Sequence, residues 1–449
     1  MPENEQQTQN EFMIEKIKER PVNKKKLIQR TILTASMAVI FGLIACFTFL
    51  VLEPVISNWL YPEEKPNPVV FPEDQEEMSP EEMLSDIMQT EKENQQPSTQ
   101  EADPTDAAVL EEEQVQQILD RVVLDKQNYL ELYAVLAEVR KEAECCIATV
   151  TGVSSNLDWF NNVEESKNQS SGLVIAENGK ELLILVDFTP IRKSEELTVT
   201  LYNGLQFPAH VKETDSFTGL AVVAVEMELV LQNMLKEEIA IATLGSSNMG
   251  NIVGSPVVAV GSPMGVTGSV GYGMITAQYA QAAGADTNYK FLQTDIFGST
   301  SAGGVLVNLQ GNVVGIITNS RNSSDTKNLV TAFGISELKK RVEKMSNGEK
   351  AAYLGIKGMD VTRQANEEQG VPYGVFIKNV DMDSPVMRAG IQKGDILTAI
   401  GDRSITGYND YTSYLMQLNA GEEVELKIMR QAQNEYKEMI FRVVPDEAK

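Results

Sequence analysis

Histidine, cysteine and tryptophan are scarce in this sequence: its 449 residues include one histidine, three cysteines and two tryptophans. Two of the cysteines, Cys145 and Cys146, are adjacent. Adjacent cysteines rarely bridge each other, so no disulfide framework is expected. No Cys-x-x-Cys pattern occurs, and a single histidine leaves few of the ligands that a zinc ion needs. We therefore expect neither a metal site nor a cofactor.

Basic residues are also few. Lysine and arginine number 38 against 64 aspartates and glutamates, which gives a net charge of −26. A field of this sign repels phosphate backbones, which argues against nucleic acid as a partner. The hydrophobic content of 42% with 31 glycines is that of an ordinary globular protein. The length suits about two or three domains.

The segment "TILTASMAVIFGLIACFTFLVL", residues 31–52, is apolar and has no charged residue. A helix of this length crosses about 30 Å of hydrocarbon. Basic residues crowd the segment before it, and an acidic flank begins at Glu53. The positive-inside rule therefore predicts a single-pass membrane protein with residues 1–30 in the cytoplasm and the later domains outside it. A cleaved signal peptide is the alternative, but the run is long for one and lacks an obvious cleavage site.

A linker and a helix are expected next. Residues 53–107 are rich in Glu, Pro, Gln and Ser, a composition that keeps a chain extended and disordered. Within residues 108–143, Val115, Val122, Tyr129 and Leu136 recur every seven positions. This pattern predicts an amphipathic helix, either in a short coiled coil that multimerises the chain or packed on the following domain.

The sequence patterns of the remaining residues predict two domains of different kinds. From residue 144 to 342, short β-branched runs such as "ELLILVDF" alternate with glycine and polar turns, and "SELKKRVEKM" closes the region as a helix. This is typical of an all-β domain built as a sandwich or barrels. Residues 343–449 predict a small α+β module with one helix near "YNDYTSYLMQLN".

Four segments of the first domain, in order, resemble the HtrA/Deg family of membrane-tethered, trypsin-like proteases with a PDZ domain. They are "SSGLVIAENGKELLILVDF", "ETDSFTGLAVVAVE", "GSPVVAVGSPMGVTGSVGYGMIT" and "LQTDIFGSTSAGGVLVNLQGNVVGIIT". They resemble the family's histidine-loop hairpin, its aspartate segment, its central hairpin and its nucleophile loop. The resemblance covers about Cys145 to Val444. It implies a mainly β protein: a trypsin-like double β-barrel followed by a PDZ domain, with an N-terminal transmembrane helix.

The catalytic triad does not follow the resemblance. Serine proteases need a hydroxyl nucleophile, an imidazole that removes its proton and a carboxylate that orients the imidazole. The resemblance puts the histidine position at Asp187 or its neighbours, the aspartate position at Gly219 and the serine position at Ala302. All three roles are empty, which implies a protease fold that no longer cuts.

Shifted alignments do not restore a triad. The sole histidine, His210, lies on an expected strand between the two loops, where a structural or surface role is the commoner one. Ser301 and Ser299 do not stand at the sharp turn that the Gly-Gly pair of "AGG" defines. A Ser–Lys pair would need a lysine nearby, and the closest in sequence are Lys290 and Lys327.

The C-terminal module has kept more of its family pattern. Within "AAYLGIKGMDV", residues Tyr353, Leu354, Gly355 and Ile356 resemble the PDZ carboxylate-binding loop, and "VFIKNVDMDSPVMRAGIQKGDILTAIGDRSI" resembles the rest of the domain. Such a loop offers successive backbone amides to a peptide C-terminus, while the next strand edge accepts the extended peptide. We expect Leu415 to complete a pocket for the last side chain. The alternative is a PDZ groove that its neighbour blocks.

These observations predict a membrane-anchored, extracytoplasmic, non-catalytic protein. It would bind peptide C-termini or unfolded protein as an adaptor, sensor or chaperone-like factor in protein quality control, with a homo-oligomer (a trimer) or a catalytic homologue as further partners. One alternative is an active HtrA-type serine endopeptidase with an unconventional base. Another is a multimeric scaffold held together by the helix over residues 108–143.

Overall fold

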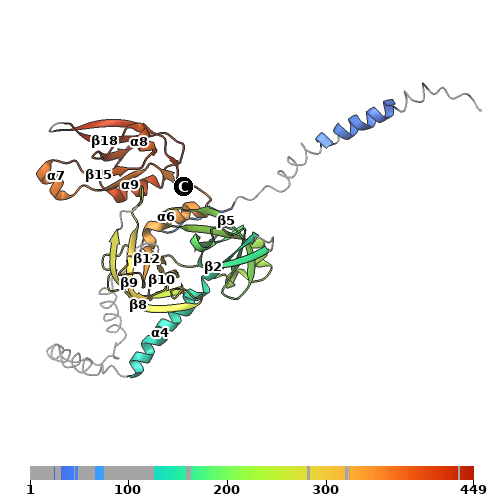
Figure 1. Cartoon of the computed structure of the whole chain (residues 1–449), viewed down its shortest axis with the longest axis horizontal. Coiled ribbons are helices and arrows are strands. Elements are labelled where there is room, and N and C mark those ends of the chain that lie inside the picture. The colour runs from blue at the N-terminus through green and yellow to red at the C-terminus, as the bar shows by residue number, and fades with distance from the viewer. Residues whose placement is uncertain are drawn as a thin grey trace, which may run out of the picture. The chain divides into compact units, whose positions relative to one another are not determined.

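The computed structural model describes residues 25, 32–44, 46–48, 66–74, 126–157, 163–280, 284–318, 322, 324–432 and 435–448 (Figure 1). The chain divides into two compact units, Met1–Lys65 and Pro66–Lys449. The second unit holds two closed barrels and a smaller sheet-and-helix module, in chain order. Of the predicted linker, residues 53–107, only 66–74 are described.

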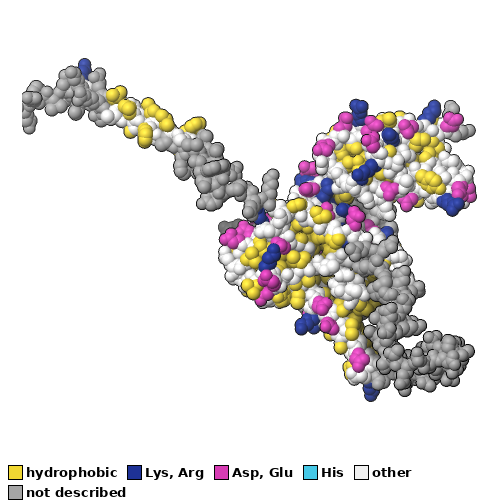
Figure 2. Space-filling view, turned by 180° about the vertical axis from the view of Figure 1, so that it is seen from behind, with side chains coloured by type: hydrophobic (Ala, Val, Ile, Leu, Met, Phe, Trp, Pro, Cys, Tyr) yellow, Lys and Arg dark blue, Asp and Glu magenta, His cyan; other side chains and the backbone are white. Residues whose placement is uncertain are grey.

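In the first unit, residues 32–44 and 46–48 are helical. Apolar side chains cover the surface of this helix (Figure 2), and Phe41 and Phe47 are 75% and 70% exposed. The predicted transmembrane span also includes residues 31, 45 and 49–52, which lie outside the described residues. Across the described ranges, no helix is both long and apolar enough to cross a membrane.

The helix predicted over residues 108–143 is seen as α4, Lys126–Cys145; residues 108–125 lie outside the described part of the chain. Its C-terminal half packs on the barrels, where Val139 and Ala143 are buried. In its N-terminal half Tyr129 and Leu132 are exposed. The C-terminal half of α4 is therefore packed on the barrels, as one of the two alternatives predicts. The coiled-coil alternative stays a prediction for the exposed N-terminal half.

The first barrel has six antiparallel strands in the closed order β1-β2-β3-β6-β5-β4. They are β1 (Ile147–Leu157), β2 (Val163–Glu177), β3 (Glu181–Asp187), β4 (Glu196–Thr200), β5 (Gln206–Thr214) and β6 (Leu220–Glu226). Alternate residues of a strand point to opposite faces. On β3, Ile184 therefore joins the barrel interior, while Leu183 and Leu185 join an apolar cluster shared with the second barrel.

The second barrel repeats this design in the closed order β10-β11-β12-β9-β8-β7. Its strands are β7 (Pro256–Ser262), β8 (Ser269–Ala280), β9 (Lys290–Phe297), β10 (Gly303–Val307), β11 (Val313–Ile317) and β12 (Leu329–Gly334). Short helical segments join the strands of the first barrel and link the barrels: Thr189–Ile191, α5 (Met227–Leu231) and Lys236–Glu238. The predicted trypsin-like double barrel is confirmed.

The closing helix is α6, Ile335–Ser346, which continues four residues beyond the predicted domain boundary at residue 342. It follows the second barrel in the chain, yet it also packs on β5 and β6 of the first. An ion pair fixes it there: Arg341 Nη2 lies 2.8 Å from Asp215 Oδ1 in the turn between β5 and β6. The Asp215 side chain is 1% exposed, and the Thr218 hydroxyl donates to its other oxygen.

The C-terminal module is the predicted PDZ domain, with a main sheet in the order β14-β15-β16-β18-β19. Its elements are β13 (Ala352–Tyr353), β14 (Ile356–Asp360), α7 (Arg363–Gln369), β15 (Val375–Val380), α8 (Pro385–Ala389), β16 (Ile396–Ile400), β17 (Arg403–Ser404), α9 (Tyr408–Leu415), β18 (Val424–Ala432), β19 (Glu435–Val443) and β20 (Asp446–Glu447). Strand β14 is an edge strand of the main sheet.

The prediction of one helix in this module was wrong, because α7 and α8 accompany α9. Both are too short to show a helical hydrophobic period. Their ends nevertheless carry recognisable signals. Thr362 and Ser384 cap the N-termini with their hydroxyls, and Gly370 and Gly390 end the helices in the left-handed conformation.

The Asp215–Arg341 pair generates a stability prediction. Replacing Arg341 by Ala leaves a buried carboxylate without its cation, which costs about 3 to 5 kcal/mol of unfolding free energy. The matched control is Arg363→Ala, which removes an exposed pair with Glu367 and should change stability by less than about 1 kcal/mol. Urea unfolding followed by circular dichroism measures both. Equal losses in the two variants would contradict the role given to the buried pair.

Candidate functional site

Asp187 and Gly219, the predicted histidine and aspartate positions, lie side by side in the first barrel. Asp187 ends β3 and pairs with Leu220, the first residue of β6. The Phe188 N–H donates to the Gly219 carbonyl over 2.9 Å. The Asp187 carboxylate accepts the Thr189 N–H at 2.9 Å, so it caps the turn that follows β3. The fold thus brings these two positions together, as the resemblance requires.

Gly219 is fitted to its surroundings as glycine. Its φ is +77°, and a Cβ built there would lie 2.8 Å from Thr189 Oγ1 and 3.9 Å from Asp187 Oδ1. A side chain at this position therefore meets both backbone strain and a steric overlap. Substituting aspartate at Gly219 would not by itself recreate a carboxylate in a relaxed geometry.

Ala302, the predicted serine position, lies in the turn between β9 and β10 of the second barrel. Its N–H donates to the Ser299 carbonyl at 3.0 Å, and its methyl group is 7% exposed and packs in the interior cluster of that barrel. Gly304, two residues further on, has a φ of +110°, and a Cβ there would lie 2.1 Å from the Val260 carbonyl oxygen on β7. This close approach requires glycine at residue 304; the assignment of Ala302 to the serine position stays a prediction.

The neighbouring hydroxyls face each other. Ser301 Oγ lies 3.0 Å from Ser299 Oγ, and both oxygens lie against the turn at Gly265, where an added Cβ would come within 2.8 Å of each. A hydroxyl cannot remove a proton from another hydroxyl at neutral pH, so this pair does not activate Ser301. Lys290 is engaged elsewhere, because its Nζ donates to Asn248 at 2.6 Å and lies 3.5 Å from Glu337.

His210 is held at the far end of the first barrel. It lies on β5 opposite Ala224, and its Nε2 is 3.4 Å from Oε1 of Glu181, which also pairs with Lys212. Glu181 begins β3 and Asp187 ends it. Six residues of strand at about 3.3 Å each separate the two ends by roughly 20 Å. The chain's sole histidine therefore does not reach the triad positions.

The PDZ loop gathers the residues that the sequence predicted, and it already holds a carboxylate. The N–H groups of Leu354 and Gly355 donate to Oδ2 of Asp286 at 2.6 and 2.7 Å, and the Ile356 N–H donates to Oδ1 at 2.8 Å. The loop amides thus hold a carboxylate in this structure. The carboxylate comes from the segment between β8 and β9 of the same chain, not from a separate peptide.

Asp286 is almost fully buried, at 5% exposure. Its own N–H donates to the Ile356 carbonyl at 2.8 Å, and the Tyr411 hydroxyl donates to its Oδ1 at 2.5 Å. Burial raises the pKa of Asp286, whereas the loop amides and the Tyr411 hydroxyl act in the opposite direction. Sequence reasoning missed both Asp286 and Tyr411, because nothing in "GADTN" signals a contact with residues almost 70 positions away.

Two other predicted groove residues have structural contacts. Tyr353 ends β13, and its hydroxyl donates to Asp381 at 2.9 Å; burial and this carboxylate raise the pKa of Tyr353. Leu415 is the last residue of α9 and is fully buried in the core of the module. Its part in a peptide pocket stays a prediction. Two other side chains of α9 contact this site. The Tyr411 hydroxyl reaches Asp286, and the Tyr408 hydroxyl donates to the Ile356 carbonyl at 3.0 Å.

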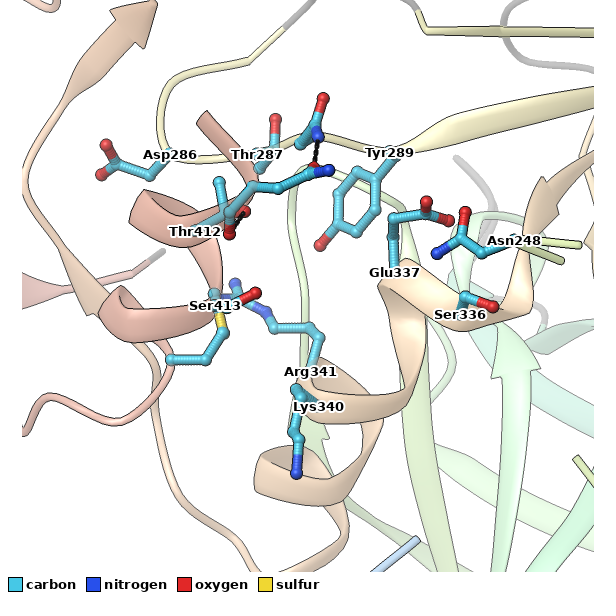
Figure 3. Close-up of a pocket in the computed structure, with 13 residues that line it drawn as sticks. Asn248, Asp286, Thr287, Tyr289, Ser336, Glu337, Lys340, Arg341, Thr412 and Ser413 are labelled. Carbon is cyan, nitrogen blue, oxygen red and sulfur yellow. Dashed lines mark hydrogen bonds between the residues drawn. The ribbon is translucent and has the colours of Figure 1, made fainter. Parts of the chain in front are cut away.

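A cavity lies between β14 and the segment that carries Asp286. Its volume is about 490 Å³, and it is lined by Gly284, Thr287, Asn288, Lys290, Lys357, Gly358, Met359, Asp360, Lys378, Asn379, Tyr408 and Asn409. A second cavity, of about 240 Å³, lies between α6, α9 and the segment that carries Asp286, Thr287 and Tyr289 (Figure 3). The structure thus combines a filled carboxylate end with an edge strand that borders free space.

Gly355 generates a prediction about the loop. Its φ is +91°, and a Cβ there would lie 2.3 Å from Ser384 Cβ, so Gly355→Ala should destabilise the PDZ module by about 2 to 4 kcal/mol through strain and overlap. Gly370→Ala is the matched control. Gly370 also has a positive φ but nothing within 4 Å, and the backbone term alone costs about 1 kcal/mol. Thermal unfolding compares the two, and equal losses would refute the overlap at residue 355.

Comparison with known proteins agrees with this architecture. A family described as trypsin-like peptidase domain matches residues 170–316, and one described as PDZ domain matches residues 352–438. A probable periplasmic serine endoprotease DegP-like of Rickettsia prowazekii is 29% identical over 295 residues, which cover 62% of this chain and 54% of that protein. The serine protease Do-like HtrA of Lactococcus lactis is 26% identical over 302 residues, covering 62% of this chain and 71% of its relative.

A solved structure shows the same fold. The HtrA-type protease AlgW with decapeptide superposes with a TM-score of 0.52 at 20% identity, over 70% of this chain and 98% of that one. The order of the two domains and the sequence relatives agree with each other. The chain thus combines a trypsin-like peptidase domain with a following PDZ domain, and it is similar in sequence to HtrA-type and DegP-like serine proteases.

Proposed function

We propose that this chain is a catalytically inactive HtrA-type protein that binds segments of other proteins through its PDZ groove. The observation that carries the proposal is the content of the three triad positions, Asp187, Gly219 and Ala302. An alanine methyl group cannot attack a carbonyl, and no imidazole stands at the histidine position to take a proton from a nucleophile.

The surroundings of these positions support the proposal of inactivity. Asp187 is used as a turn cap, Gly219 has a left-handed backbone that overlaps Thr189 once a Cβ is added, and the Ala302 methyl is packed into the barrel core. His210 is paired with Glu181 about 20 Å from the Asp187 end of β3. A single substitution therefore does not rebuild the triad.

The PDZ module supports the binding role. An edge strand with free backbone groups accepts an extended peptide as an added strand. Strand β14 is an edge strand of the main sheet and borders the cavity of about 490 Å³; its first residue, Ile356, is bonded to Asp286 through its N–H and its carbonyl. The ligands we propose are peptide C-termini or unfolded segments, which would suit an adaptor, sensor or chaperone-like factor in protein quality control. The AlgW structure, by its description, contains a decapeptide.

The proposed location is the outer side of a membrane. The uncharged run over residues 31–52, the basic residues before it and the exposed apolar side chains of residues 32–44 and 46–48 support a single-pass anchor. The Rickettsia relative is described as periplasmic. We propose domain limits of 144–342 for the barrels and 343–449 for the PDZ module.

One observation favours each alternative function. Both sequence relatives are described as serine proteases, and Ser301 adjoins Ala302, so an active endopeptidase with an unconventional base is the first alternative. The exposed apolar residues in the N-terminal half of α4, Tyr129, Leu130, Leu132, Tyr133 and Val135, favour a homo-oligomer such as a trimer. A multimeric scaffold is the second alternative.

Catalytic silence is directly testable. The full-length chain should neither hydrolyse unfolded casein nor react with a fluorophosphonate probe, because Ala302 has no hydroxyl and His210, the sole histidine, is paired with Glu181 away from the triad positions. Ala302→Ser should stay silent as well, since no imidazole is placed to take its proton. The control is Ser301→Ala, which should match the unmodified chain. Casein turnover that disappears in Ser301→Ala would establish the endopeptidase instead.

A further inference from the structure

We propose that Asp286 is a built-in ligand of the PDZ carboxylate-binding loop, so that a free peptide C-terminus binds only by displacing it. This inference rests on the proposed binding role of the groove. It adds the chain's own segment, residues 284–288, as the resting occupant. In the resting state the loop therefore binds a carboxylate of its own chain. The external ligand is the C-terminal carboxylate of a peptide, which competes with Asp286 for the loop.

The contacts of Asp286 are those that the last residue of a bound peptide would make. A terminal carboxylate needs successive loop amides, and the terminal residue's N–H needs a carbonyl on the neighbouring strand edge. Asp286 uses the amides of Leu354, Gly355 and Ile356 for its carboxylate and the carbonyl of Ile356 for its own N–H. Its side-chain carboxylate therefore stands where a peptide's α-carboxylate would bind.

All partners of this carboxylate are donors. Three backbone N–H groups and the Tyr411 hydroxyl converge on its two oxygens within 2.8 Å. Hydrogen bonds to an ionised acceptor are roughly twice as strong as neutral ones. An incoming carboxylate cannot share these donors with Asp286, because the side chain is buried among them. A peptide C-terminus can therefore bind to these donors only when Asp286 has left them.

The segment that must leave is short and has a fixed end. Tyr289 stacks on Phe217 and packs edge-on against Phe333, with ring centroids 5.6 and 5.7 Å apart, in the cluster shared by the barrels. Asn288 contacts Asn409 of α9. Release therefore requires loss of the Asp286 and Asn288 contacts, while Tyr289 stays anchored. The backbone of Asp286 itself has a φ of +61°, a conformation that side chains other than Asn and Asp seldom adopt.

The competition has a predictable size. A tethered group next to its site has an effective concentration of about millimolar. If Asp286 occupies the loop in at least nine molecules of ten, the apparent affinity for a free C-terminus falls tenfold or more, by roughly the fraction of open molecules. A merely structural tether predicts the reverse, since loosening it would leave peptide affinity unchanged or lower it.

The experiment uses the full-length chain and two fluorescent decapeptide pools that differ only at the C-terminus, one ending in free carboxylates and the other in amides. Fluorescence anisotropy compares the unmodified chain with Asp286→Ala and with Asp286→Asn, which keeps the side-chain size but loses the charge. Circular dichroism confirms that both variants are folded. The control is Asp383→Asn, an exposed aspartate in the same module that also has a positive φ, 58°.

We expect both Asp286 variants to bind the free-carboxylate pool roughly tenfold or more tightly than the unmodified chain. The amidated pool and Asp383→Asn should show no such gain. Hydrogen exchange at the amides of Leu354, Gly355 and Ile356 should accelerate in Asp286→Ala and slow again with the free-carboxylate pool.

Two results would overturn the proposal. Binding of both pools by the unmodified chain without any gain in the folded Asp286 variants would make Asp286 a structural tether and would leave the proposed binding function intact. Absence of binding by every protein to either pool would reject the built-in ligand and the proposed function together.

Discussion

The apolar cluster between the two barrels is the constraint on which the rest of this structure depends. It exists because strands have a period of two: on β3, β6, β7 and β10 one set of alternate residues fills a barrel interior and the other faces the neighbouring barrel. Leu183 and Leu185 meet Val258 and Val260 in this cluster, and α6 closes over it. Burying each of these side chains stabilises the fold by about 1.5 to 3 kcal/mol. This stabilisation does not depend on catalytic activity.

This separation explains how a protease architecture can persist if the triad is lost, as we propose. The positions of Asp187, Gly219 and Ala302 are set by strand ends and by close backbone approaches such as that of Gly304 to Val260. Those constraints act on the backbone, so they hold whatever side chains stand at the three positions. The fold therefore identifies the relatives, whereas the side chains decide the chemistry.

The parts of the fold that depend on local sequence patterns could be predicted from the sequence. Alternating apolar runs with glycine turns indicated the two barrels, and "YLGI" in register with the later PDZ pattern indicated the carboxylate loop. Contacts between distant residues were not predictable. The pairing of His210 with Glu181 depends on the order β3-β6-β5. Asp286 stands in a glycine- and alanine-rich turn that resembles any solvated loop, and Tyr411 is part of an ordinary amphipathic helix.

The loop's own hydrogen-bonding needs account for Asp286. Three N–H groups that converge in a buried turn require an acceptor, because an unpaired buried donor costs about 1 to 3 kcal/mol. The residue that supplies the acceptor also donates its own N–H to the Ile356 carbonyl, which the Tyr408 hydroxyl reaches as well. A side chain with one methylene spans this distance from the edge strand to the loop. A glutamate would carry its carboxylate one methylene further and would have to fold back on itself. The same geometry by which we propose that the loop receives a peptide C-terminus therefore suits an aspartate when the chain supplies the ligand itself.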